Sequence, residues 1–319
     1  MMAVDVERTI PLIVIVGPTG VGKTAAAVAL ARRLPIEVVS ADSRQVYRGM
    51  DVATGKPTAA ERAAVPHHLI DVIDPDDRYS AARFRVDAAV AIEEIHRRGR
   101  IPAVVGGTGL YVRSLLRGLD PAPPADLAYR EELAGIAARE GRSELHARLQ
   151  AASPVLARRL HPNDTVRVIR ALERLEQGMP ALDERQWQGR VADYAVTYVG
   201  LTMDRRALAR RLHGRAAAMV AAGLEDEVRA LLARGHGADL PAMHGIGYRE
   251  FVRVIAGGLE RDEALRLMQR DTVRYAKRQW TWFQREPDVT WIDVERAGGP
   301  AEVALTIEQR RGTEEARRG

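Results

Sequence analysis

The sequence LIVIVGPTGVGKT, residues 12–24, decides the fold. The apolar run at 12–16 is typical of a strand at the centre of a parallel sheet, and residues 24–34 are strong helix formers. Between them, residues 17–24 match the phosphate-binding pattern G-x-x-x-x-G-K-[ST]. A strand before and a helix after are the context that this pattern requires. We therefore expect an α/β protein that binds a phosphorylated ligand.

Each position of this loop has an expected role. Its residues are Gly17, Pro18, Thr19, Gly20, Val21, Gly22, Lys23 and Thr24. The glycines let backbone N–H groups close around phosphate oxygens, and the N-terminus of the following helix adds partial positive charge. We expect Lys23 to reach the outer phosphates and the Thr24 hydroxyl to face Mg²⁺, the cofactor that the loop predicts.

Composition narrows the class of protein. At 319 residues the chain is long for one domain, so an insertion or a second domain is expected. The absence of cysteine excludes disulfides, thiolate nucleophiles and Cys-ligated zinc. No apolar run approaches the ~20 residues of a membrane span, and no signal pattern opens the chain. We expect a cytoplasmic protein without membrane contact. The net charge of +5 decides little by itself.

Strand and helix patterns alternate through the first third of the chain. Further strands are expected at 37–40, 69–73 and 101–105. Such alternation is typical of a parallel sheet with helices on both faces and ligands at the carboxyl ends of its strands.

The pattern changes after a proline-rich break at residues 120–126. Only helical segments follow, until 196–201 alternates like a strand that returns to the sheet. We predict a P-loop NTPase-like parallel sheet flanked by helices, with an inserted all-helical domain. The expected boundaries are 1–119 and 200–297 for the core, 120–199 for the insertion and 298–319 for a flexible tail.

Two further features are expected at the sheet edge that carries the P-loop. Asp42 follows the second strand, where a carboxylate could bind Mg²⁺, orient an acceptor, act as general base or cap the next turn. A second glycine-rich turn, 106–109, leaves the fourth strand. It could approach a ligand closely or be a tight strand–helix connection.

Basic residues gather on two expected helices. Arg167, Arg170 and Arg174 share one face of the helix at 163–177 by their i, i+3, i+4 spacing. A second stripe recurs every fourth residue after Glu260 and consists of Arg266, Arg270, Arg274 and Arg278, with Lys277 and aromatic residues among them. A solvated face is the usual meaning of such a stripe, but few acidic residues lie within it. RNA or another polyanion is therefore an equally weighted interpretation.

With these features in place, the chain resembles the bacterial tRNA dimethylallyltransferase (tRNA isopentenyltransferase) family. The motifs that carry the resemblance are 17–24, 42–51, 106–111, 161–164 with Arg167 and 170–173, 245–250 and 277–283, together with Arg215 upstream of 223–228 and, more weakly, Arg130. Departures lie at Ala53 and Gly55, where the family usually has glycine and alanine, and at Gln284, where arginine is common. They affect expected tRNA contacts only.

The resemblance implies a reaction and a set of site residues. A dimethylallyl group would pass from dimethylallyl diphosphate to N6 of the adenosine 3′ of the tRNA anticodon, with release of diphosphate. Asp42 would be the base, and Lys23, Arg215 and Thr19 would act on the diphosphate held by the P-loop. The implied tRNA contacts are Asp42, Ser43, Arg44, Gln45, Thr108, Arg130, Val166, Arg167, Val168, Ile169, Arg170, His244, Gly245, Ile246, Gly247, Tyr248, Arg249, Lys277 and Arg278.

Three alternatives remain open at this point. A small-molecule P-loop kinase would share the loop and Asp42 but would not need the insertion. An adenylate isopentenyltransferase, which makes free cytokinin, would keep both but would lack much of 120–199. A non-catalytic RNA-binding protein would have no use for Lys23, Thr24 and Asp42 together. ATP binding is an open question, and we expect a monomer.

Overall fold

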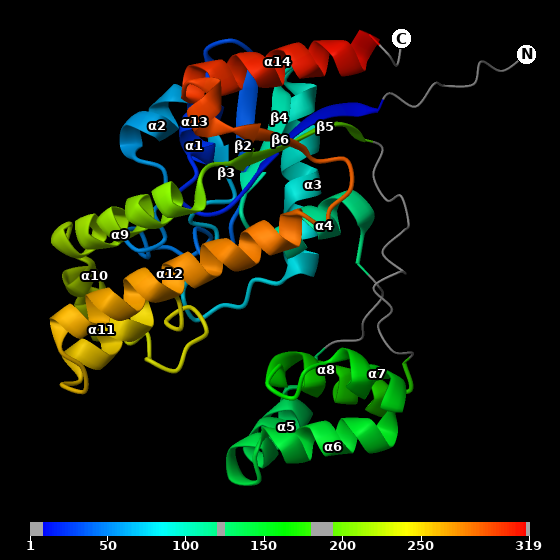
Figure 1. Ribbon diagram of the computed structural model, residues 1–319, viewed down its shortest axis with the longest axis vertical. Helices are drawn as coiled ribbons and strands as arrows, with labels where there is room; N and C mark the ends of the chain where they lie inside the picture. Colours follow the sequence, from blue (N-terminus) through cyan, green and yellow to red (C-terminus); the bar gives the residue numbers. More distant parts are fainter. Residues whose placement is uncertain (1–8, 120–124, 180–193, 317–319) are drawn as a thin grey trace, which may run out of the picture. The chain divides into compact units, whose positions relative to one another are not determined.

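The computed structural model describes residues 9–119, 125–179 and 194–316, and a parallel sheet lies at its centre (Figure 1). The sheet has six strands in the order β3-β2-β4-β1-β5-β6, all paired in parallel. The strands are β1 (Ile10–Val16), β2 (Ile36–Ala41), β3 (His67–His68), β4 (Ile101–Gly106), β5 (Tyr194–Thr202) and β6 (Thr290–Asp293). The predicted P-loop-type sheet is confirmed.

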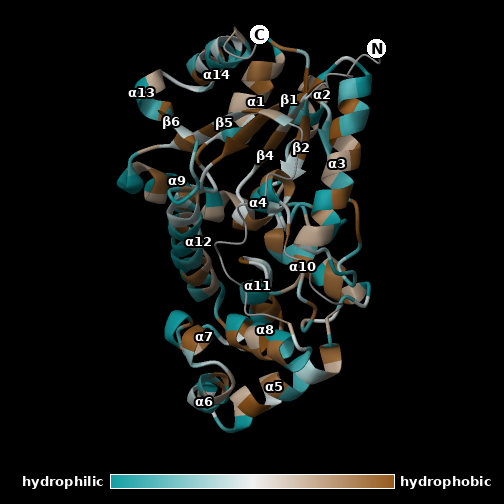
Figure 2. Cartoon of the chain, turned by 90° about the vertical axis from the view of Figure 1, so that its right-hand side faces the viewer, coloured by the Kyte–Doolittle hydropathy of each residue, from teal (hydrophilic) through white to brown (hydrophobic). Residues whose placement is uncertain are grey.

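Helices cover both faces of this sheet, which explains its continuous apolar strands. One face packs against α1 (Lys23–Ala31) and α14 (Pro300–Ala316). The other packs against α3 (Ala81–Arg97), α4 (Gly109–Arg117) and Phe283. In Figure 2 the strand segments near β1 and β5 are brown, whereas α3 and α14 carry teal segments. Burial of both faces requires apolar residues at successive strand positions.

A third apolar cluster lies beyond the carboxyl ends of the strands. It joins the segment at 46–73 to the helices that follow β5. These helices are α9 (Arg205–Ala221), α10 (Leu224–Ala233), α11 (Tyr248–Ile255) and α12 (Arg261–Phe283). Helices α9 and α12 pack side by side (Figure 1). Two short helices, α2 (Ala59–Ala64) and α13 (Val294–Ala297), complete this part of the chain.

Residues 117–190 form a second compact unit. Its described helices are α5 (Leu127–Arg139), α6 (Arg142–Ala152), α7 (Pro154–Arg159) and α8 (Thr165–Glu176). They enclose an apolar core of their own. The unit corresponds to the expected insertion but ends before β5, because residues 194–200 pair with β1 in the sheet. The expected boundary at residue 199 was therefore too late.

Two local predictions were wrong. The expected flexible tail instead contains α14, whose buried Val303, Ala304 and Ile307 pack on the sheet and α1. The expected strand at 69–73 does not form. Leu69 and Asp71 have φ angles of 61° and 59°, which turn the backbone out of the extended conformation. The edge strand is the shorter β3.

No helix in the described part of the chain is long and apolar enough to cross a bilayer.

Candidate active site

The P-loop forms the expected turn between β1 and α1. Gly17, Gly20 and Gly22 have φ angles of 143°, 79° and 109°, a region that disfavours other residues. A Cβ atom on Gly17 would also lie 2.5 Å from the carbonyl oxygen of Leu201 on β5. Both constraints require glycine at residue 17. The loop is therefore shaped by its backbone and by its contact with the neighbouring strand.

The Lys23 ammonium group folds back over this loop. Its Nζ atom donates hydrogen bonds to the carbonyl oxygens of Gly17 at 2.9 Å and Pro18 at 3.0 Å. Burial is the main reason that the pKa of Lys23 is lowered to about 8; the Asp42 carboxylate opposes this shift and nearby Arg215 adds to it. An anion bound at the loop would favour the protonated form and raise this pKa.

Arg215 reaches the P-loop from α9. Its guanidinium group donates to the Thr19 hydroxyl over 3.4 Å, and a Cβ atom on Gly55 would lie 1.8 Å from its Nη2 atom. Arg210 and Arg211 on the same helix are exposed. Of these three arginines, only Arg215 lines the cavity described below. The role that the resemblance implies for Arg215 stays a prediction.

Asp42 lies at the carboxyl end of β2 and caps the turn that follows. Its Oδ1 atom accepts hydrogen bonds from the backbone N–H groups of Arg44 at 2.8 Å and Gln45 at 3.3 Å. Both bonds end on the same oxygen, so this turn does not use Oδ2. The capping interpretation is thus correct, and it leaves a carboxylate oxygen for a ligand.

One cavity of about 280 Å³ brings these groups together. Thr19, Asp42 and Arg215 line it, with α12 along one side. The cavity also includes eight predicted tRNA contacts besides Asp42, namely Ser43, Arg44, His244, Gly245, Ile246, Tyr248, Arg249 and Arg278. Segments separated by more than 200 residues in the sequence therefore meet at one site, at the carboxyl end of the sheet.

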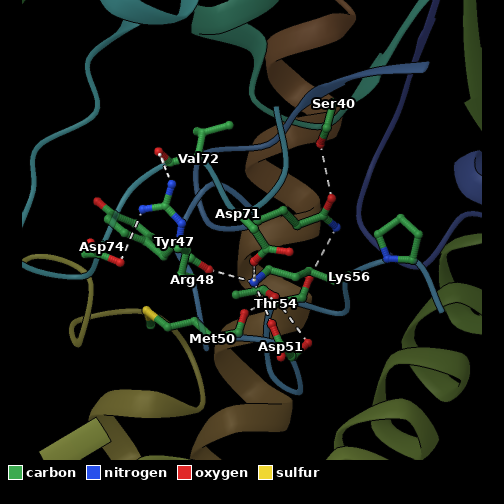
Figure 3. A network of polar contacts seen from close by, with 12 residues as sticks. Ser40, Tyr47, Arg48, Met50, Asp51, Thr54, Lys56, Asp71, Val72 and Asp74 are labelled. Carbon is green, nitrogen blue, oxygen red and sulfur yellow. Dashed lines mark hydrogen bonds and ion pairs between the residues drawn. The ribbon is translucent and has the colours of Figure 1, made fainter. Parts of the chain in front are cut away.

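The loop that carries Asp42 is held by a network around Lys56 (Figure 3). The Lys56 side chain is 3% exposed and bonds to the carboxylates of Asp51 and Asp71. Its Nζ atom also donates to the carbonyl oxygen of Tyr47 at 2.6 Å. Two carboxylates against one ammonium group compensate for its burial. The network fixes the backbone that leads from the cavity to α2.

Several other predicted residues have interactions inside the protein. The Gln45 side chain accepts a hydrogen bond from Ser40 and donates to the carbonyl oxygens of Thr54 and Gly55. Thr108 accepts a hydrogen bond from the backbone of Ser43 at 3.1 Å. Gln45 and Thr108 do not line the cavity themselves but bind the backbone of Thr54 and Ser43, which do. Lys277 is exposed on α12.

Gly247 precedes α11 in the first unit, and the remaining predicted tRNA contacts belong to the second unit. Arg130 makes two hydrogen bonds to Glu173, at 2.9 and 2.8 Å. Val168 is buried in the core of this unit and Ile169 packs against it, whereas Val166 is 78% exposed. Among the predicted contacts of α8, Val166 and Arg167 are thus the most exposed side chains.

The two arginine stripes differ in exposure, because all four arginines of the α12 stripe are exposed whereas those of the α8 stripe are not all exposed. Arg174 is 4% exposed, so it does not share the exposed face of Arg167. On α12, the single carboxylate of Asp271 pairs with Arg270 and Arg274, and with Arg249 on α11. The carboxylate of Asp271 therefore offsets part of the positive charge on this stripe.

Sequence reasoning did not assign Tyr275 to the site, although it lines the cavity. Burial, followed by the charge of Asp42, raises the pKa of Tyr275 to about 12. The available signal was helical spacing, because Met268, Thr272, Tyr275 and Arg278 all line the cavity and recur every three or four residues on α12.

The parallel sheet and the P-loop define a P-loop-type α/β protein, with a carboxylate beside the loop. A sequence-family profile described as IPP transferase matches residues 45–286, and one described as isopentenyl transferase matches residues 10–71. The chain belongs to the IPP transferase family.

Named relatives and solved structures agree with this assignment. The chain is 50% identical to tRNA dimethylallyltransferase 1 of Syntrophotalea carbinolica, over 90% of this chain and 92% of that protein. A crystal structure of the full-length tRNA isopentenylpyrophosphate transferase of Bacillus halodurans is 40% identical, with a TM-score of 0.71 over 97% of this chain and 99% of the other. A eukaryotic dimethylallyltransferase captured acting on tRNA matches at 28% identity with a TM-score of 0.71, over 89% and 74% of the two chains.

Proposed function

We propose that the protein transfers a dimethylallyl group from dimethylallyl diphosphate to N6 of the adenosine 3′ of the anticodon in tRNA. The products are N6-(dimethylallyl)adenosine in tRNA and diphosphate. The observation that carries the proposal is the shared cavity. The Arg215 guanidinium, suited to a diphosphate, and the Asp42 carboxylate, suited to a weak nucleophile, line the same space.

Asp42 acts on the acceptor. The N6 amino group of adenine is a poor nucleophile because its lone pair is delocalised into the ring. A carboxylate that accepts a hydrogen bond from this amino group aligns it, and the same carboxylate takes the proton as the new C–N bond forms. Since Oδ1 already binds the backbone N–H groups of Arg44 and Gln45, we assign this role to Oδ2.

Lys23, Arg215 and Thr19 act on the donor. Allylic C–O cleavage leaves positive charge on the allyl group and transfers negative charge to the departing diphosphate. Lys23 and Arg215 donate to neutral oxygens of Gly17, Pro18 and Thr19. These cations therefore keep a net charge that can stabilise the leaving group.

The oxygen donors of the site fit Mg²⁺. Mg²⁺ usually keeps several waters and binds proteins through few oxygens, with substrate phosphates as further ligands. In the described residues there is no group of three or more His, Cys, Asp or Glu that could hold a metal ion. We propose that the Thr24 hydroxyl, in the first turn of α1, is the protein ligand. When bound, the ion would neutralise charge on the diphosphate.

The RNA side of the site is proposed to include the cavity residues Arg44, His244, Arg249 and Arg278. A base inside an anticodon loop must leave its stack to reach a cavity, and contacts to the backbone offset the cost of unstacking. The exposed residues Val166 and Arg167 of the helical unit are proposed as additional contacts. A cytoplasmic location and a monomeric state remain predictions from the sequence.

A free adenylate is the alternative acceptor, because the base would use the same carboxylate. One experiment separates the two acceptors. The protein is incubated with dimethylallyl diphosphate and Mg²⁺, and with either unmodified tRNA or AMP, and nucleosides are then analysed by mass. We expect N6-(dimethylallyl)adenosine from tRNA only. A product from AMP alone would assign the free-nucleotide activity, and no product from either would refute the proposed transfer.

A further inference from the structure

Gln279 connects three segments of the chain that meet beneath the cavity. It lies on α12 and its side chain is 6% exposed. Its Oε1 atom accepts a hydrogen bond from the backbone N–H of Thr19 at 2.8 Å, and its Nε2 atom donates to the carbonyl oxygen of Gly107 at 2.9 Å. One amide group thus joins α12 to the P-loop and to the turn after β4.

The glycine-rich turn after β4 is shaped to receive this helix. A Cβ atom on Gly107 would lie 2.2 Å from Nε2 of Gln279, and one on Gly109 would lie 2.1 Å from the Trp282 ring. These glycines therefore allow α12 to approach the sheet edge. The sequence left open a close approach to a ligand or a tight strand–helix connection; packing against α12 is a third reason for glycine at these two positions.

Gln279 lies on α12 between residues that pack on the sheet and residues that line the cavity. Phe283, one turn later, is buried against the sheet. Tyr275 and Arg278, on the preceding turn, line the cavity. Gln279 lies between the anchored end of the helix and the part that meets the acceptor. A ligand that contacts Tyr275 and Arg278 would therefore bind the same stretch of α12 that carries the amide bound to the P-loop.

Thr19 links Gln279 to the groups that would bind the diphosphate donor. Its backbone N–H is bound by Gln279, and its hydroxyl accepts the hydrogen bond from Arg215. Fixing the backbone of Thr19 therefore fixes where its hydroxyl and the Arg215 guanidinium meet. Hydrogen-bonded contacts of this kind can carry coupling between two sites, and the coupling is reciprocal.

We propose that Gln279 is a positioning residue that couples RNA binding at α12 to diphosphate binding at the P-loop. This inference rests on the proposed function, because it takes tRNA as the ligand at α12. Its physical content is that bound RNA strengthens diphosphate binding, and that the hydrogen bond between Gln279 and Thr19 carries this effect.

The test measures the affinity of inorganic diphosphate with and without a saturating anticodon stem-loop RNA. In the unaltered protein we expect RNA to tighten diphosphate binding about fivefold, the effect of roughly one hydrogen bond. In Gln279→Met, which keeps the volume but loses both hydrogen bonds, the ratio should fall to nearly one. RNA affinity without diphosphate should stay within about twofold, because Gln279 does not line the cavity.

Two further variants keep the test decisive. Gln279→Glu retains an oxygen that accepts from Thr19, so its ratio should stay near that of the unaltered protein even if the added charge weakens diphosphate binding. Gln269→Met is the matched control, because Gln269 lies on the same helix and donates to the carbonyl oxygen of His213. It should keep the full ratio.

The outcomes separate this inference from the proposed function. If the unaltered protein modifies tRNA but shows no coupling, or if Gln279→Met keeps the full ratio, the inference is wrong and the transfer activity stands. Loss of the ratio in Gln279→Glu as well as Gln279→Met would remove the role given to the bond with Thr19. Failure to modify tRNA at all would overturn the proposed function instead.

Discussion

Lys23 and Arg215, at the P-loop, differ from Arg130 and Arg167, in the helical unit, in the groups that they bind. Lys23 donates to backbone carbonyl oxygens and Arg215 to a hydroxyl. Arg130 and Arg167 instead pair with the carboxylates of Glu173 and Asp164. A cation bound to neutral oxygens keeps its net charge for a ligand, whereas one bound to a carboxylate is partly neutralised. The number of arginines alone therefore does not identify a binding surface. The chemical type of each cation's hydrogen-bond partner, which we call partner chemistry, is the better guide.

Glu173 shows the structural use of such a pair. Burial alone would raise its pKa, but hydrogen bonds from Arg130 and from the backbone of Asp126 hold the pKa of this carboxyl below its usual value. Its side chain is 3% exposed. The Arg130 pair thus stabilises a buried charge between α5 and α8, which is a sufficient reason for its presence.

The largest expected effect comes from the single carboxylate of the cavity. Asp42→Asn should reduce kcat by about 10²–10⁴, because an amide cannot take the N6 proton. Affinity for tRNA should stay within a few-fold, since the amide oxygen can still accept from the backbone N–H groups of Arg44 and Gln45. Single-turnover rates and RNA binding measure the two effects. Asp74→Asn, an exposed carboxylate that pairs with Arg48, is the control. Unchanged kcat in Asp42→Asn would move the base elsewhere.

The second-largest loss of activity is expected for Arg215→Gln. The loss of a cation that faces the departing diphosphate should lower kcat/KM for dimethylallyl diphosphate by about 10²–10³. Arg210→Gln, an exposed arginine on the same helix, should leave it unchanged. Initial rates at varied donor concentration test both variants. Equal losses in the two variants would show that the overall charge of α9 matters, and would contradict the comparison drawn above.

These predictions rest on parts of the site that the sequence made visible. All residues of the P-loop motif are close together in the sequence. The strand, the glycines and Lys23 could therefore be predicted from about a dozen consecutive residues. Asp42 was predictable because strand ends of a parallel sheet share an edge. Which of the arginines at 210, 211 and 215 reaches the loop required the packing of α9, and only the family resemblance indicated it.

Residues whose role depends on distant partners could not be predicted. Gln279 binds Thr19 across a sequence separation of 260 residues. The helix α14 has few buried residues, and their partners lie on the sheet and α1 near the start of the chain. Without those partners, its charged sequence resembles a disordered tail. The failure of the strand at 69–73 depends on two positive φ angles that apolar patterning does not reveal.

The titration of Lys23 gives a smaller, graded effect. Its pKa is lowered to about 8 by burial, and only the protonated form attracts diphosphate. Affinity should therefore be full below pH 8 and fall by up to about tenfold per pH unit above it. Lys23→Arg, which stays charged throughout this range, should bind diphosphate with little pH dependence. Diphosphate affinity is measured by calorimetric titration from about pH 6.5 to about pH 9.5, which spans the pKa of Lys23. Parallel pH profiles for the two proteins would exclude Lys23 as the titrating group.

The smallest expected effect, and the sharpest test of the comparison, is the salt dependence of tRNA binding. Arg278 is exposed and lies over the Tyr275 ring at 5.7 Å. Arg167 has a single long pair with Asp164 at 3.6 Å. If both contact phosphates, Arg278→Gln and Arg167→Gln should each reduce the slope of log K against log salt by up to about one unit.

Arg130→Gln should act differently, because its partner is a buried carboxylate. We expect the helical unit to lose about 2 kcal/mol of stability, a value reduced for the partial exposure of Arg130, and to melt at a lower temperature. The salt slope of the folded protein should not change. Fluorescence titrations at four or so salt concentrations, with melting curves for each variant, measure both properties. An unchanged melting temperature with a reduced slope would assign Arg130 to tRNA, and partner chemistry would then fail to distinguish structural from binding arginines.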